Sequence, residues 1–341
     1  MLTIVYPKIK VASGTKSYVD TVLGGISEAH YPFSSVGIRK IEFSVSGKPL
    51  GGIVSQRMGL LLHRNLSHPI HALVPEVSPE GVDVVTIHDI IPFLKSSEFI
   101  KTAYDRSAYN MMYERALKAK ILIVSTETVK KELVTSLNIG EERVRVIYQA
   151  IDSSKFSRSE NSPYPDNGKV HLVTVGDFNP RKRFDLLYEI VSRNKDMELY
   201  HLGPVNSWKD RASKLADLAK KSGNIFLKGE VNEETLIRYL SNADLFVFIT
   251  EAEGFGIPPI EAMSCGTNVV LNDLPIFKET IGEFGFLSSI DRFEETISYA
   301  LKNKKKSEVL RNHSLKYSIK KEISDLLSIY QEIEDNQPSP E

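Results

Sequence analysis

Short apolar runs alternate with helical patterns from one end of the chain to the other, and this alternation constrains the fold most. Runs rich in Val, Ile and Leu, such as Leu2–Tyr6 and Leu245–Ile249, are typical of strands that are buried on both faces. Segments with an apolar residue every three or four positions, such as Thr126–Leu137 and Phe184–Arg193, predict helices between them. This order of strands and helices favours an α/β fold built on parallel sheets.

Both halves of the chain contain this alternation. The remaining strands are expected at Ile41–Val45, Val82–His88, Ile121–Ser125, Val144–Tyr148, Val170–Gly176, Met197–Gly203, Ile225–Lys228 and Asn268–Leu271. The remaining helices are expected at Tyr104–Ala119, Trp208–Lys221, Glu233–Leu240, Pro258–Ser264 and Tyr317–Ile333. With 341 residues, the chain is long enough for two domains of roughly 150 residues each.

The segment Ser157–Gly168 divides the alternation in two. It is rich in Ser, Pro, Asn and Gly and has no apolar period, so it is predicted to be a linker. We therefore expect a Rossmann-like domain over residues 1–160, a second one over residues 169–315, and a final helix over residues 316–333. Because ligands of open α/β sheets bind beyond the carboxyl ends of the strands, the cleft between two such domains is the expected ligand site.

Composition excludes several classes of protein. The chain is 41% hydrophobic and 26% charged, which argues against disorder, and its net charge of −1 argues against nucleic-acid binding by bulk charge. No apolar run approaches the roughly 20 residues that span a bilayer, and the N-terminus lacks the pattern of a signal peptide. The single cysteine, Cys265, allows no disulfide within the chain and no Cys-based zinc site. These features together favour a cytoplasmic protein.

The most informative string runs over residues 250–267, TEAEGFGIPPIEAMSCGT. A strand is expected to end just before it. Gly254 and Gly256 then permit a tight turn, and Pro258 and Pro259 suit the first positions of a helix. The turn therefore leads into a helix N-terminus, whose free amides are suited to bind phosphate oxygens.

Two glutamates bracket this turn. Glu253 precedes it, and Glu261 follows eight positions later inside the expected helix. A carboxylate accepts hydrogen bonds from two hydroxyl groups, as a sugar or a ribose offers them. Each glutamate alone also has a simpler explanation, since Glu261 favours the helix dipole and Glu253 suits a solvated loop.

With GFGIPPI between them, Glu253 and Glu261 resemble the E-x7-E motif of glycosyltransferase family 4, whose members are retaining nucleotide-sugar enzymes. Further segments resemble the family in the same order along nearly the whole chain. These segments are Val84–Asp89, Ile121–Thr126, Val146–Asp152, Val173–Arg183 and Gly229–Val231. The resemblance implies an α/β fold of the GT-B type, in which two Rossmann-like parallel-sheet domains face a cleft and a C-terminal helix returns to the N-terminal domain.

The resemblance also implies roles for individual residues. Glu261 would bind the ribose hydroxyls of the nucleotide, Glu253 would bind hydroxyls of the donor sugar, and His88, at the end of a strand, would contact that sugar. Backbone groups that would help to hold the donor belong to Gly254, Phe255, Gly256, Ile257, Gly14 and Val231. The other seven histidines, His201 among them, are interpreted as structural.

Arg181 and Lys182 follow the expected strand Val170–Gly176. Members of the family clamp the donor diphosphate with a basic pair beyond this strand, where cations stabilise the negative charge of the leaving group. Asp177 stands where the family commonly has an arginine, so we expect Arg181 to supply the missing guanidinium. Without this context, a basic loop before a helix is an ordinary solvated surface.

The resemblance implies retaining transfer of a hexose, of mannose or glucose type, from a UDP- or GDP-sugar to a hydroxyl of a glycan or lipid-linked glycan. No cofactor and no metal are expected, because the sequence has no Asp-x-Asp motif and no Gly-x-Gly-x-x-Gly after a strand. The alternatives are a catalytically silent subunit that binds nucleotide sugars or glycans, and a nucleotide-sugar epimerase of the same fold.

A basic stretch with interleaved tyrosines runs from Lys95 to Lys120. Such a surface suits peripheral contact with the cytoplasmic face of a membrane, which a lipid-linked acceptor would require. The solvated face of an amphipathic helix explains the same pattern.

Overall fold

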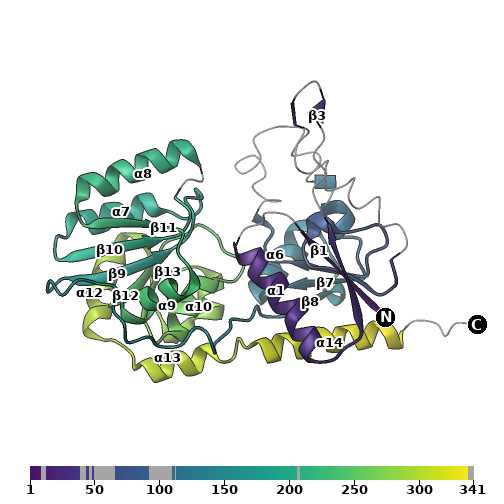
Figure 1. Ribbon diagram of the computed structural model, residues 1–341. Coiled ribbons are helices and arrows are strands. Elements are labelled where there is room, and N and C mark those ends of the chain that lie inside the picture. The colour runs from purple at the N-terminus through teal and green to yellow at the C-terminus, as the bar shows by residue number, and fades with distance from the viewer. Residues whose placement is uncertain are drawn as a thin grey trace, which may run out of the picture. The chain divides into compact units, whose positions relative to one another are not determined.

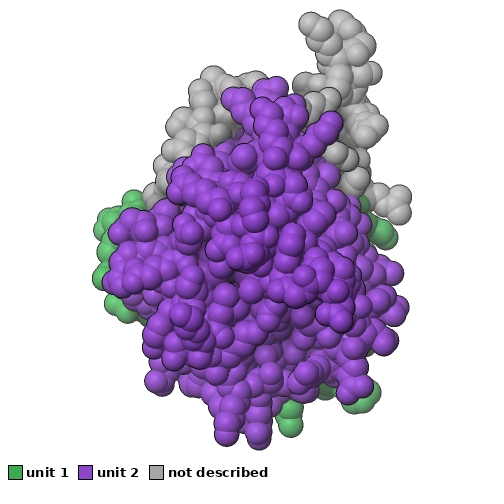
Figure 2. Space-filling view, turned by 90° about the vertical axis from the view of Figure 1, so that its left-hand side faces the viewer, with its two compact units in different colours: residues 1–150, 319–341 green, residues 151–318 purple. Residues whose placement is uncertain are grey.

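The computed structural model describes residues 1–8, 13–38, 44–45, 48–49, 66–91, 110–111, 113–205 and 208–336. The chain divides into two compact units (Figures 1 and 2). Unit 1 consists of Met1–Ala150 together with Ile319–Glu341, and unit 2 consists of Ile151–Ser318. Unit 1 is therefore built from two separate stretches of the chain.

Unit 1 contains a six-stranded parallel sheet in the order β2-β1-β5-β6-β7-β8. Its strands are β1 (Leu2–Pro7), β2 (Phe33–Ile38), β5 (Ile70–Ala72), β6 (Val84–Ile87), β7 (Ile121–Val124) and β8 (Val144–Val146). The helices are α1 (Ser13–Glu28), α6 (Glu127–Leu137) and α14 (Ile319–Asp335), with 3₁₀ turns at Pro75–Val77 and Glu141–Arg143. A separate antiparallel pair joins β3 (Ser44–Val45) to β4 (Lys48–Pro49).

Successive residues of the strands in unit 1 enter two different cores. Ile4 and Val84 belong to a cluster with residues of α1 and α14, whereas Val5 and Val85 belong to a second cluster with residues of α6. Because side chains alternate between the faces of a strand, both faces of the sheet are covered. This double burial explains why the strands are continuous apolar runs.

Unit 2 contains a second six-stranded parallel sheet, in the order β11-β10-β9-β12-β13-β14. Its strands are β9 (Val170–Val175), β10 (Met197–Leu202), β11 (Ile225–Gly229), β12 (Leu245–Phe248), β13 (Val269–Asn272) and β14 (Phe286–Ser288). Its helices are α7 (Phe184–Arg193), α8 (Lys209–Ser222), α9 (Glu233–Asn242), α10 (Ile257–Ser264), α11 (Pro275–Thr280), α12 (Phe293–Lys302) and α13 (Ser307–Ser314). Short 3₁₀ turns lie at Gly282–Phe284 and Ile290–Arg292, and α7 packs beside α8 (Figure 1).

The predicted α/β class with two parallel sheets is confirmed. All five strands expected after residue 169 form within one or two positions of their predicted bounds. Elements that the sequence did not reveal are α1, β2, β5, α11, α12, α13 and β14. The strand expected at Ile41–Val45 and the helix expected at Tyr104–Ala119 lie largely outside the described residues, although residues 113–116 are helical.

The segment Ser157–Gly168, predicted to be a linker, is instead part of unit 2. Asn242 Nδ2 donates to the carbonyl of Ser159 (3.0 Å), and the Tyr164 hydroxyl donates to the carbonyl of Tyr239 (2.8 Å), so the segment is attached to α9. Tyr164 also stacks on the ring of His171. A polar sequence without an apolar period is thus held in place by a few hydrogen bonds and one aromatic side chain.

None of the described helices is both long enough and apolar enough to cross a membrane.

Candidate functional site

Loops at the carboxyl edge of the sheet in unit 2 carry most of the residues that the sequence pointed to. Arg181 and Lys182 follow β9, Val231 follows β11, and Glu253 follows β12. All pairings in this sheet are parallel, so these strands end at the same edge. Because β9 pairs directly with β12, the loop that carries the basic pair lies beside the loop that carries Glu253.

The turn between β12 and α10 has the form that its sequence predicts. Gly256 has a φ of +90°, and α10 begins at the next residue with prolines in its first turn. A Cβ at Gly256 would lie 2.9 Å from Cε1 of Phe277, so this position requires glycine for space as well as for backbone conformation. Phe255 is buried and packs edge-on against Tyr317. Its backbone, rather than its ring, is therefore the part available to a ligand.

Glu253 forms an ion pair with Arg181. The Nη1 atom of Arg181 contacts Oε1 of Glu253 and also donates to the carbonyl of Ala252 at 2.6 Å. The side chain of Glu253 is only 12% exposed, and the hydroxyl of Thr250 lies 3.4 Å from Oε1. A pair of opposite charges with this little exposure is screened weakly by water, so each charge strongly orients the other.

The loop after β9 also holds a second ion pair. The Nζ atom of Lys182 lies 3.4 Å from Oδ1 of Asp177 and 5.9 Å from the centre of the Phe248 ring. A Cβ at Gly176 would lie 2.7 Å from this Nζ atom, so the lysine folds over a position without a side chain. The two cations of the predicted pair thus have different neighbours, since Arg181 faces Glu253 whereas Lys182 faces Asp177.

Backbone bonds attach this loop to β12 and the turn that follows. The amide of Arg183 donates to the carbonyl of Ile249 (3.1 Å), and the amide of Glu251 donates to the carbonyl of Arg181 (2.8 Å). At the start of α7, Asp185 accepts from both Arg183 and Arg211, and Arg183 also reaches Glu251 at 3.1 Å. No sequence pattern pointed to Arg211, because only the fold brings the start of α8 beside the start of α7.

Glu261 lies on α10, one turn beyond the glycine turn. Burial, and to a lesser degree the charge of Glu233, raises the pKa of Glu261 to about 7. A carboxyl group with this pKa is partly protonated and partly ionised near neutral pH. In its ionised form it is a strong acceptor for hydroxyl hydrogen bonds.

His88 and Gly14 belong to unit 1. His88 follows β6, where burial lowers its pKa to about 4, so its ring is neutral at neutral pH. Nε2 of Gln149 donates to Nδ1 of His88 at 2.5 Å, and the ring of Tyr18 meets the imidazole edge-on. Gly14 lies in the first turn of α1, the helix that also carries Tyr18. The sequence did not single out Gln149 or Tyr18, since their partnership with His88 exists only in the folded unit.

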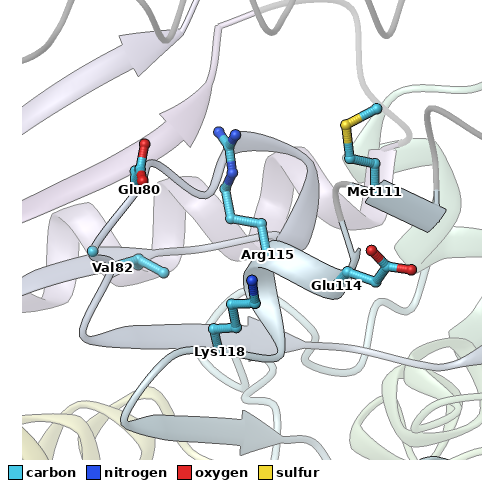
Figure 3. Close-up of a pocket in the computed structure, with 7 residues that line it drawn as sticks. Glu80, Val82, Met111, Glu114, Arg115 and Lys118 are labelled. Atoms are coloured by element: carbon cyan, nitrogen blue, oxygen red, sulfur yellow. The ribbon is translucent and has the colours of Figure 1, made fainter.

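A pocket of about 260 Å³ lies elsewhere in unit 1 (Figure 3). It is lined by Glu80, Gly81, Val82, Met111, Glu114, Arg115 and Lys118. Val82 precedes β6 whereas His88 follows it, so this pocket lies at the opposite end of that strand and contains none of the predicted site residues. Arg115 and Lys118 belong to the basic stretch named above, most of which falls outside the described residues.

Within the described part of the chain, no group of three or more His, Cys, Asp or Glu side chains is arranged to hold a metal ion. Arg181, Lys182 and the N-terminus of α10 contribute positive charge at the carboxyl edge of unit 2.

Residues 156–317 match the protein family described as "Glycosyl transferases group 1". Unit 2 is similar to this family. The matched residues cover nearly all of that unit, including both loops that carry the paired charges. The assignment made from Glu253, Glu261 and the segments around them is thereby confirmed at the level of the family.

Other comparisons extend beyond this domain. The chain is 31% identical over 202 residues to the O-antigen chain mannosyltransferase RfbU of Salmonella typhimurium. The aligned region covers 58% of this chain and 54% of that protein. The chain thus spans about half the length of the curated relatives it matches.

Solved structures resemble the chain over nearly its full length. Sucrose-phosphate synthase from Thermosynechococcus elongatus superposes with a TM-score of 0.80 at 16% identity, over 99% of this chain and all of the other. Anabaena Alr3699/HepE, solved in complex with UDP and glucose, has a TM-score of 0.74 at 15% identity, over 97% of this chain and all of the other. At such low identity these likenesses establish the fold, and they confirm the expected GT-B class.

Proposed function

We propose that the protein is a glycosyltransferase that moves a hexose from a nucleoside-diphosphate sugar to an acceptor hydroxyl with retention at the anomeric carbon. The observation that carries this proposal is the pairing of Glu253 with Arg181 beside the glycine turn that opens α10. A carboxylate that can accept hydrogen bonds from hydroxyl groups and a positively charged guanidinium are thus in direct contact. A sugar joined to a diphosphate offers hydroxyl groups for the carboxylate and, next to them, negatively charged phosphate oxygens for the guanidinium.

In this proposal the residues of unit 2 act by binding and by electrostatics. Glu261 accepts from the ribose hydroxyls, and Glu253 accepts from hydroxyls of the transferred sugar. Lys182 and Arg181, with the amides of residues 254–257, stabilise the charge that develops on the diphosphate as the glycosidic bond breaks. The released diphosphate then takes the proton of the acceptor hydroxyl on the same face of the sugar. The residues of the chain position the groups and require no covalent intermediate.

We infer that the sugar is mannose and that the acceptor is a growing polysaccharide chain or its lipid-linked precursor. The name of the relative RfbU, an O-antigen chain mannosyltransferase, supports this choice. A glucosyl donor carried by UDP is the second candidate, because the HepE structure was solved with UDP and glucose.

A thermal-shift panel of UDP-, GDP- and ADP-sugars tests the donor. A ligand at 100 times its Kd stabilises the folded state by about 2.7 kcal/mol, so the matching nucleotide sugar raises the unfolding midpoint by several degrees. We expect GDP-mannose to give the largest shift. If no nucleotide sugar moves the midpoint, the proposed donor site is wrong.

Steady-state kinetics with that donor test the two glutamates. Glu261→Ala is expected to raise KM for the donor with little change in kcat, whereas Glu253→Ala mainly lowers kcat. Wild-type kinetics in both variants would contradict these roles.

Release of nucleoside diphosphate that depends on the acceptor separates a transferase from a silent subunit and from an epimerase, which uses no acceptor.

We further propose that the reaction needs no divalent metal, because side-chain cations and a helix N-terminus supply the positive charge. Turnover in EDTA is expected to stay within about twofold of turnover in Mg²⁺. Loss of activity in EDTA that Mg²⁺ restores would overturn this point.

A peripheral contact with a membrane remains a proposal of its own, since it rests on the basic stretch between Lys95 and Lys120. Flotation with liposomes that contain anionic lipid tests it, and a protein that stays in the bottom fraction at low salt would exclude it.

A further inference from the structure

His201 is a buried histidine on β10 that the proposed chemistry does not use. Its side chain is fully buried, and it lies between α7 and the carboxyl end of β9. Nε2 of His201 is 2.8 Å from the carbonyl oxygen of Gly176, and Nδ1 is 2.5 Å from the hydroxyl of Tyr188. Both ring nitrogens therefore have a single, well-placed partner.

The partners determine where the ring carries its hydrogen. A carbonyl oxygen can only accept, so Nε2 must be the protonated nitrogen, and Nδ1 then accepts from the Tyr188 hydroxyl. Burial lowers the pKa of His201 to about 4, so the ring remains in this neutral form at neutral pH. The hydroxyl of Tyr188 thus keeps His201 in the tautomer that can donate to Gly176.

The accepting carbonyl belongs to the peptide that joins Gly176 to Asp177. In a trans peptide the N–H points opposite to the C=O, so the amide of Asp177 is directed away from the His201 ring. The backbone of Gly203, the residue after β10, lies close to the same carbonyl. Gly203 has a φ of +130°, and a Cβ there would lie 2.3 Å from the Gly176 oxygen.

We propose that His201 is a positioning residue that locks the peptide between Gly176 and Asp177. Glycine at position 176 makes rotation of this peptide inexpensive, and a rotated peptide would direct a carbonyl oxygen instead of an N–H toward an anion. The lock keeps the Asp177 amide, and the Asp177 carboxylate that pairs with Lys182, in one arrangement. The inference rests on the proposed function, in which this loop receives the diphosphate of the donor.

Removing the lock should reduce the fraction of molecules that can bind the diphosphate. We expect His201→Phe to raise the Kd for UDP or GDP, measured by calorimetry, by about five- to tenfold. His201→Gln, whose amide can still donate, should recover the Kd to within about threefold of the parent. Tyr188→Phe removes only the hydroxyl that selects the tautomer, and it should raise the Kd by about threefold. This variant serves as the test if His201→Phe fails to fold.

His313 supplies the matched control. It is also buried in unit 2, and its Nε2 lies 2.8 Å from a backbone carbonyl, that of Thr280, outside the loop after β9. His313→Phe is expected to lower the unfolding midpoint while the Kd stays within about twofold of the parent. Equal Kd values for the parent, His201→Phe and Tyr188→Phe would overturn the inference, whereas a parent protein that binds none of UDP, GDP and ADP would instead refute the proposed function.

The tautomer is tested without any ligand. Nitrogen-15 NMR of the imidazole should show the hydrogen of His201 on Nε2 between pH 5 and pH 8. A hydrogen on Nδ1 would show that the ring does not donate to Gly176, and the lock would be wrong.

Discussion

Lys182 is held in place by two neighbouring side chains, Asp177 and Phe248. The Asp177 carboxylate lies on one side of its ammonium and the Phe248 ring lies below it, and the side chain is only 14% exposed. A cation that is already oriented and partly desolvated loses little freedom when an anion arrives. The free energy needed to orient and desolvate this ammonium group is therefore supplied when the chain folds and not when the anion binds.

Replacing Lys182 with alanine should lower kcat by about 10²-fold or more, as the loss of a group that stabilises developing charge does. The control is Lys305→Ala, because Lys305 also rests on an aromatic ring, that of Phe286, but belongs to the loop before α13. Steady-state rates with saturating donor make the comparison. A loss below threefold for Lys182→Ala would assign it to the ordinary surface.

Glu261 should make the stability of the fold depend on pH. Its pKa rises from 4.5 in the unfolded chain to about 7 in the folded one, so the folded state binds the proton more tightly between these values. Unfolding free energy therefore falls as the pH rises from 5 to 8. Glu261→Gln removes this loss, so the variant should gain about 2 to 3 kcal/mol over the parent across that interval, measured by urea unfolding.

Glu234→Gln, at an exposed position on α9, is the control for this experiment. Because its side chain is exposed, the substitution should change the unfolding free energy by less than about 0.5 kcal/mol. A difference between Glu261→Gln and the parent that does not change with pH would show that the Glu261 carboxyl is not desolvated by folding.

At the scale of elements, sequence patterns predicted what local rules determine and missed what distant contacts determine. The strands of unit 2 and the turn into α10 follow from apolar runs, glycine and proline. α1 was missed because Gly24 and Gly25 disfavour a helix, yet Gly25 is where α14 approaches closely, with Ile323 only 2.4 Å from the position of a Cβ. Only the far end of the chain explains that glycine.

The candidate site divides in the same way. The residue types of Glu253, Glu261, Arg181 and Lys182 and their order could be read from the sequence. Their pairing could not, because Arg181 meets Glu253 only through the adjacency of β9 and β12. The supporting side chains of His201 and Arg211 carry no local signal at all.

The contact between β9 and β10 gives a prediction at this scale. Gly203→Ala places a Cβ against the Gly176 carbonyl and should lower the unfolding free energy by about 3 kcal/mol. Gly223→Ala is matched to it, because Gly223 also has a positive φ but has open space around it, and it should cost only about 1 kcal/mol. Chemical denaturation measures both, and equal losses would show that the close approach at Gly203 is unimportant.

At the scale of the whole molecule, unit 1 depends on a helix that follows unit 2 in the sequence. α14 contributes Ile323, Leu326, Ile329, Tyr330 and Ile333 to a core shared with β1 and α1. The hydroxyl of Tyr330 also lies 2.6 Å from Nδ1 of the buried His71. The helix is therefore a part of the core of unit 1 and not an appendage to it.

Leu326→Ala should destabilise unit 1 by about 3 kcal/mol, as the removal of a fully buried leucine does. Leu315→Ala changes the same type of side chain at a position that is 53% exposed, and it should stay within about 0.5 kcal/mol of the parent. The two variants are compared by their urea unfolding midpoints and by amide hydrogen exchange in β1 and α1. Unchanged exchange in Leu326→Ala would mean that α14 is not needed there.

The split composition of unit 1 has a consequence for biosynthesis. As the ribosome makes the chain, residues 1–150 are made before unit 2, whereas the helix that covers Leu2, Ile4 and Val22 is made after it. Until that helix has been made, an apolar surface of residues 1–150 stays uncovered. Unit 2, by contrast, is one continuous stretch and is already fully synthesised at that point. Premature termination before residue 319 would leave that surface open to aggregation and chaperone capture, even though unit 2 would be complete.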